Sequence, residues 1–123
     1  MNNSQVAHIK RSQKESLLLK ELSKMLHQLS LDDKELEGLT INRVELSRDK
    51  SVCLVFFYDA AGPDMFKQKL SRLVLYKPTI RKSLAGILDS RYVPNIRFMF
   101  DIHFEKRQRI ETLMNEVKKE FKK

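Results

Sequence analysis

The chain has 123 residues, 41% of them hydrophobic and 33% charged, with a formal net charge of +8. This composition is typical of a globular protein of one domain, and the lone Cys53 excludes an internal disulfide. No stretch approaches the roughly 18 apolar residues of a membrane span, and no apolar run precedes Leu17 as in a signal peptide. We therefore expect a cytoplasmic protein with one domain over residues 1–123, frayed at 1–4 and 122–123.

The first predicted element is an amphipathic helix over about residues 5–29, because apolar residues recur at helical spacing from Leu18 to Leu29. Its start is open. Ser12 and Glu15 have the spacing of a capping box, and a start near Ser4 is equally consistent. An acidic connection over 30–38 follows, and its carboxylates are expected to be solvated.

Two strands over residues 39–47 and 52–58 are predicted to form an antiparallel hairpin, because a tight turn joins them. The apolar positions change parity at Asn42-Arg43, which indicates a β-bulge. The second strand is apolar on both faces, which predicts a central place in the sheet and a buried, unreactive Cys53.

Asp64 is a candidate N-cap for the next helix. From Phe66 to Leu88 the apolar positions stay in phase with one helix, but Pro78 removes a helical hydrogen bond. We expect two helical halves that meet within two residues of Pro78. Alternating apolar residues predict a third strand over 96–102, and helical spacing predicts a closing helix over 104–121.

Charge is unevenly distributed along these elements. Residues 66–97 carry eight Lys or Arg and one acid, Asp89, which gives +7, whereas residues 25–65 carry −4. Ordinary solvated surfaces mix charges of both signs. The concentration therefore indicates a surface that binds a polyanion, and nucleic acid is the expected one.

The expected fold class is α+β, with a three-stranded sheet covered by helices on one face and the order α-β-β-α-(kink)-α-β-α. That order is similar to a type II KH domain. Within this group the chain resembles the bacterial ribosome-binding factor A family over about residues 5–115. The matching features are Ile80-Arg81, Leu84, the basic-x-Val-Pro entry at 91–94, and Phe98 with Asp101.

The resemblance implies a cytoplasmic, non-catalytic factor that binds the free small ribosomal subunit, assists late maturation of its ribosomal RNA and matters especially in the cold. The chain has Tyr76-Lys77-Pro78 where the family has Ala-x-Gly at the kink, and proline bends a chain by other means. There is no Gly-x-x-Gly between the two helices, so an ordinary KH grip on four nucleotides is not predicted.

The predicted RNA contacts lie near the kink and the third strand, with an extension on the first helix. The candidate phosphate ligands are Lys77, Arg81, Lys82, Arg91 and Arg97, extended by Lys10 and Arg11. Tyr76 and Tyr92 are candidates for base stacking, with packing inside the fold as the alternative. The strand aromatics Phe56, Phe57, Phe98 and Phe100 are expected in the core.

Catalytic and metal signatures are lacking in the sequence. The three histidines are scattered, and no nucleophile–base set or phosphate-binding glycine loop occurs. We expect no enzyme activity, no cofactor and no metal, and a monomer that binds the small ribosomal subunit and its RNA but no membrane. Two alternatives stay open: a generic KH-like module for single-stranded RNA, and a protein-interaction adaptor that docks through the helix over 104–121.

Overall fold

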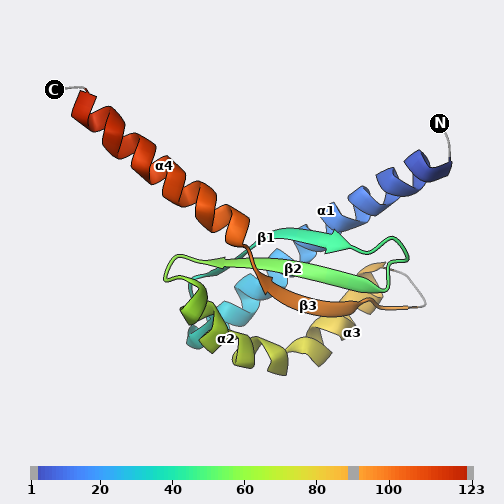
Figure 1. The fold of residues 1–123 in the computed structure, drawn as a ribbon. Helices are drawn as coiled ribbons and strands as arrows, with labels where there is room; N and C mark the ends of the chain where they lie inside the picture. Colours follow the sequence, from blue (N-terminus) through green and yellow to red (C-terminus); the bar gives the residue numbers. More distant parts are fainter. Residues whose placement is uncertain (1–2, 89–91, 122–123) are drawn as a thin grey trace.

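The computed structural model describes residues 3–88 and 92–121. It contains a mixed set of helices and strands in the predicted order, with one additional short 3-10 helix after the first α-helix (Figure 1). The elements are α1 (Asn3–Asp32), η1 (Lys34–Leu36), β1 (Leu39–Leu46), β2 (Val52–Asp59), α2 (Pro63–Leu75), α3 (Lys77–Leu88), β3 (Asn95–Phe100) and α4 (Ile102–Phe121).

The three strands form one sheet with the order β1-β2-β3, so the predicted central place of β2 is confirmed. β1 pairs antiparallel with β2, and β3 pairs parallel with β2. The register shifts between Ile41 and Arg43, which confirms the bulge inferred from the change of parity. A parallel third strand requires a long crossover, and α2 and α3 supply it.

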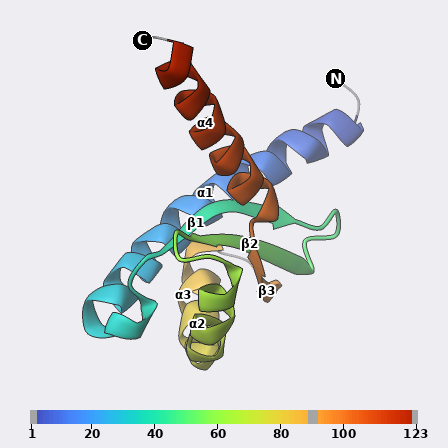
Figure 2. The same ribbon diagram turned by 60° about the vertical axis from the view of Figure 1, so that its left-hand side comes forward.

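Helices α1, α2 and α3 lie on one face of the sheet (Figures 1 and 2). Each contributes the apolar stripe that the sequence predicted, and the sheet contributes every second residue of its strands. The burial of these stripes is the main source of stability, because apolar area leaves water there. The buried set includes Leu18, Leu22, Leu26, Val44, Cys53, Val55, Phe57, Phe66, Leu73, Ile80, Leu84, Ile96 and Phe98.

Several predicted boundaries differ from the structure. Helix α1 extends from Asn3 to Asp32, which agrees with the alternative start near Ser4, so the capping-box start at Ser12 is wrong and Ser12 lies inside the helix. The N-cap of α2 is Gly62 with Pro63 at the first turn, and Asp64 lies in that turn rather than at the cap. Ile102 belongs to α4 rather than to the third strand. The carboxylate of the buried Asp101 accepts a hydrogen bond from Phe104 N at 3.1 Å and so ends the strand by capping the helix.

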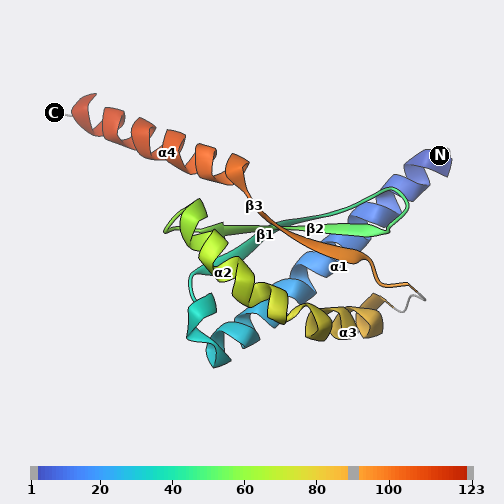
Figure 3. The same cartoon turned by 60° about the horizontal axis from the view of Figure 1, so that its bottom comes forward.

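The prediction that the last helix closes the fold is wrong. Figures 1 and 3 show α4 pointing away from the sheet instead of covering it. At its base the Phe104 ring packs against Tyr58, with ring centroids 4.6 Å apart. Farther along, the apolar stripe of Ile110, Leu113, Met114 and Val117 is exposed. Periodicity predicted the helix and its stripe but could not show what the stripe contacts.

No helix among the described residues is long and apolar enough to cross a membrane.

Candidate nucleic-acid interface

The two halves of the crossover meet at Tyr76, which confirms a break within two residues of Pro78. Tyr76 ends α2 with φ −90° and ψ −4°, and α3 begins at Lys77. Ile80 N donates to Tyr76 O at 2.9 Å, so the helical hydrogen bonds of α3 begin at Tyr76, directly after α2. Pro78 lies in the first turn of α3, where a backbone N–H has no helical acceptor in any case. The proline therefore lies in α3 without the loss of a helical hydrogen bond.

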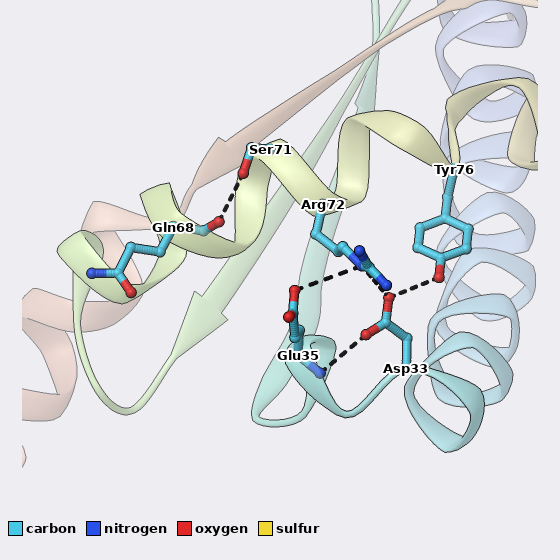
Figure 4. Close-up of polar contacts among 6 residues, drawn as sticks. All are labelled: Asp33, Glu35, Gln68, Ser71, Arg72 and Tyr76. Carbon is cyan, nitrogen blue, oxygen red and sulfur yellow. Dashed lines mark hydrogen bonds and ion pairs between the residues drawn. The ribbon is translucent and has the colours of Figure 1, made fainter.

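A buried carboxylate fixes this junction to the end of α1 (Figure 4). Asp33 is only 7% exposed, and its Oδ2 accepts from Arg72 Nε at 2.5 Å and from the Tyr76 hydroxyl at 2.8 Å. Its Oδ1 accepts from Glu35 N at 3.1 Å. The hydrogen bond from Arg72, then that from Tyr76, holds the pKa of Asp33 below its usual range. Asp33 was expected to be a solvated loop carboxylate, and this expectation is wrong.

A second internal ion pair joins α2 to the sheet. Lys69 Nζ lies 2.5 Å from the Oδ2 of Asp59, which is also buried, and 2.6 Å from Glu37 O. Together with the Arg72–Asp33 pair, it accounts for two of the eight cations in the basic segment 66–97. These two cations hold the fold together, so neither is a candidate phosphate ligand.

The remaining cations of the junction divide into one half-buried lysine and an exposed set. Lys77 is half-buried, and its Nζ lies 5.3 Å from the centroid of the Phe98 ring. Arg81 and Lys82 are exposed on α3, and Arg97 is exposed on β3. Over residues 3–88 and 92–121, none of these four cations forms an ion pair with an acidic side chain. We call Lys77, Arg81, Lys82 and Arg97 the junction cations.

The other predicted site residues have different surroundings. Lys10 and Arg11 lie on α1, where they line a groove with Arg48 and Lys50 of the β1–β2 turn. Arg91 lies outside the described residues. The Tyr76 ring packs against the core and its hydroxyl donates to Asp33, as the alternative of packing inside the fold predicts. Tyr92, by contrast, is 77% exposed. The stacking prediction is therefore retained for Tyr92 only.

Sequence reasoning missed Arg48, Lys50 and the Asp33 network. The turn Arg48-Asp49-Lys50 was visible as a turn, but only the fold places it beside α1. Chemically, the exposed surface offers cations and hydrogen-bond donors, which suit phosphate groups. Within the described part of the chain there is no cluster of three His, Cys, Asp or Glu that could hold a metal ion.

Comparison with known proteins gives a consistent result. The family profile described as ribosome-binding factor A matches residues 10–114. The ribosome-binding factor A of Shewanella oneidensis is 33% identical over 102 residues, which cover 81% of this chain and 68% of that protein. The protein of the same name from Desulfosudis oleivorans is 34% identical over 96 residues, 73% of this chain and 70% of its own length.

Two solved structures have the same fold. The crystal structure of ribosome-binding factor A from Thermus thermophilus superposes with a TM-score of 0.60 and 26% identity, over 73% of this chain and 93% of that one. The solution structure of a Thermotoga maritima protein described as a putative ribosome binding factor A superposes with a TM-score of 0.55 and 27% identity, over 69% of this chain and 84% of that one. These matches confirm the α+β, KH-like fold class.

Proposed function

This chain is a member of the ribosome-binding factor A family, and we propose that it binds the free small ribosomal subunit and assists late maturation of its ribosomal RNA without catalysis. The observation that supports this role is the set of junction cations. Lys77, Arg81 and Lys82 lie on α3, directly after a fixed helix junction, and Arg97 lies on β3. The side chains of Arg81, Lys82 and Arg97 are exposed, and no carboxylate among the described residues neutralises them. The role places the protein in the cytoplasm, where ribosomes assemble.

The proposed mechanism is positional. The Asp33 network and the Lys69–Asp59 pair hold α2, α3 and the sheet in one arrangement before RNA arrives. Preorganised phosphate ligands lose little conformational freedom on binding, so they favour the one RNA conformation that matches their spacing. Phosphate contacts set the position of the protein on the RNA but carry no sequence information.

The same argument explains release and a stronger requirement in the cold. When the RNA matures or the large subunit joins, the preferred conformation is lost, and with it the differential affinity that retained the protein. At low temperature misfolded RNA escapes slowly, so a factor that stabilises one conformation has a larger effect.

The test is the distribution of tagged protein from cell extract across a sucrose gradient. We expect it with free small subunits and largely absent from assembled ribosomes. Cells that lack the protein should accumulate small subunits with unprocessed RNA ends, most visibly in the cold. Co-migration with polysomes, or with no ribosomal particle at all, would contradict the proposal.

One observation favours a second candidate, an adaptor that binds another protein through α4. The stripe of Ile110, Leu113, Met114 and Val117 is exposed over a helix that leaves the sheet (Figure 3). Such a face suits an apolar groove on a partner. Salt separates the two candidates, because phosphate contacts weaken steeply with salt and an apolar contact does not. Gln at Leu113 and Val117 should then abolish binding only in the adaptor case.

A further inference from the structure

The N-terminal half of α1 and the turn between β1 and β2 form a basic groove of about 590 Å³. Lys10 and Arg11 line it from the helix, and Arg48 and Lys50 line it from the turn. Figures 1 and 3 show these two segments side by side at one end of the sheet. We propose that this groove, the α1–turn groove, is a second site for RNA phosphates, separate from the junction cations. The inference rests on the proposed function, because that function supplies RNA as the ligand.

The fold holds the two walls of the groove together. Glu15 Oε2 accepts a hydrogen bond from Leu46 N at 2.7 Å, which fixes α1 against the last residue of β1. The turn is closed by Lys50 N, which donates to Ser47 O at 2.9 Å. Lys50 has φ 60°, a left-handed conformation that is uncommon for residues other than glycine, asparagine and aspartate. The tight turn between β1 and β2 requires this conformation, which fixes the place of Lys50 beside the groove.

The groove gathers like charges that the folded protein does not neutralise. The nearby Lys14 ammonium, followed by partial burial and by Lys10, lowers the pKa of Lys50. Within the described residues, Lys10, Arg11, Lys14, Arg48 and Lys50 form no ion pair. An anion bound there would relieve this mutual repulsion.

The acids beside the groove are already engaged by other groups. Glu15 binds the backbone of β1. Asp49 Oδ1 accepts from the hydroxyls of Ser51 and Ser47 at 2.7 Å each, and these bonds, that of Ser51 first, lower the pKa of Asp49 to about 2. A guanidinium nitrogen of Arg11 also lies 3.1 Å from His8 Nδ1. The cations Lys10, Arg11, Lys14, Arg48 and Lys50 outnumber these two acids, so the groove keeps an excess of positive charge.

The position of the groove determines which ligand it suits. Asn95 N donates to Ser51 O at 2.8 Å, so the turn adjoins the start of β3, and Arg97 follows two residues later. The α1–turn groove thus adjoins the start of β3, the strand that carries Arg97. A folded RNA, with two backbone segments at a junction, can contact both surfaces at once, which favours it over a short single strand.

Three paired variants test the site. Arg48→Gln with Lys50→Asn removes the charges of the turn, and asparagine tolerates the left-handed conformation of residue 50. Lys10→Gln with Arg11→Gln removes the charges that α1 contributes to the groove. The matched control is Lys118→Gln with Lys119→Gln, two exposed lysines on α4. Circular dichroism and thermal melting verify that each variant folds. The two probes are purified small ribosomal subunits and a generic RNA hairpin of about 16 base pairs, the length that a double-stranded RNA-binding domain spans.

Each groove variant should bind both probes on the order of tenfold more weakly, with the log–log salt slope reduced by about 1.5, because two phosphate contacts are lost. The control should change neither. Groove variants that bind subunits and hairpin as the control does would overturn the inference while leaving the proposed function intact. If the wild type does not bind small subunits and the groove variants lose hairpin binding, the result would support the groove and contradict the proposed function. No binding of the wild type to either probe contradicts both.

Discussion

Arg72 Nε lies 2.5 Å from Oδ2 of Asp33, 39 positions earlier in the chain, and this contact ties the helix junction to the end of α1. The same carboxylate oxygen accepts a hydrogen bond from the Tyr76 hydroxyl, so the last turn of α2 and the residue at the break share one buried acceptor. The contact converts one cation of the basic segment from a surface charge into part of the framework, and it explains why the junction has a defined geometry despite its proline.

Replacing Asp33 by Asn should lower the midpoint of thermal unfolding at pH 7, because Arg72 and Tyr76 lose a charged acceptor. The folded state depresses the pKa of Asp33, so its stabilisation is present above the unfolded pKa of about 4 and is lost as pH falls through the folded value. Thermal melts from pH 7 to pH 2 measure this. Asn at the neighbouring exposed Asp32 is the control, and equal acid sensitivity of the two variants would rule out the network.

Replacing Pro78 by Gly tests what the proline contributes to the junction. The proline lies in the first turn of α3 and needs no N–H there. Glycine should lower the free energy of unfolding by about 1 kcal/mol, mainly because it raises the conformational entropy of the unfolded chain. It should leave RNA binding unchanged. Urea titration with a parallel binding assay measures both. A large change in affinity at equal stability would show that the proline itself shapes the interface.

Truncation of Leu84 to Ala should destabilise the protein by about 2–5 kcal/mol, since a fully buried side chain leaves a cavity. Leu84 is 0% exposed, whereas Leu75 on α2 is 69% exposed. Leu75→Ala should therefore change the free energy of unfolding by no more than about 0.5 kcal/mol. Urea denaturation compares the two variants, and similar losses would place the core elsewhere.

The Cys53 thiol should be unreactive in the folded protein. Burial, followed by the Glu15 carboxylate, raises its pKa to about 11. Near pH 8 the reactive thiolate is then almost unpopulated, and the side chain is inaccessible. A thiol reagent should label Cys53 only at the rate of unfolding, and rapid labelling of the native protein would contradict this burial. Because the thiol titrates more readily when unfolded, stability should also fall between about pH 9 and pH 11.

The sequence predicted the elements of the fold but not the pairing of its charges. The apolar run at 52–58 located the central strand, and Pro78 located the break between the two helices, because local patterns determine both. The roles of Asp33, Arg72 and Lys50 depend on segments that are distant in the chain and meet only in the fold. For α4 the helix was predicted correctly but its packing was not, because periodicity identifies an apolar face and does not show what that face contacts.

The central claim is that the junction cations dock the protein on the small ribosomal subunit, and charge reversal tests it most directly. Affinity for purified small subunits would be measured across a salt series for the wild type, for Arg81→Glu with Lys82→Glu, and for Lys118→Glu with Lys119→Glu as the matched control. We expect a steep salt dependence for the wild type. The junction variant should bind on the order of tenfold or more weakly, with a slope smaller by about 1.5 and an unchanged circular dichroism spectrum. Equal affinity and slope for the two folded variants would contradict the account.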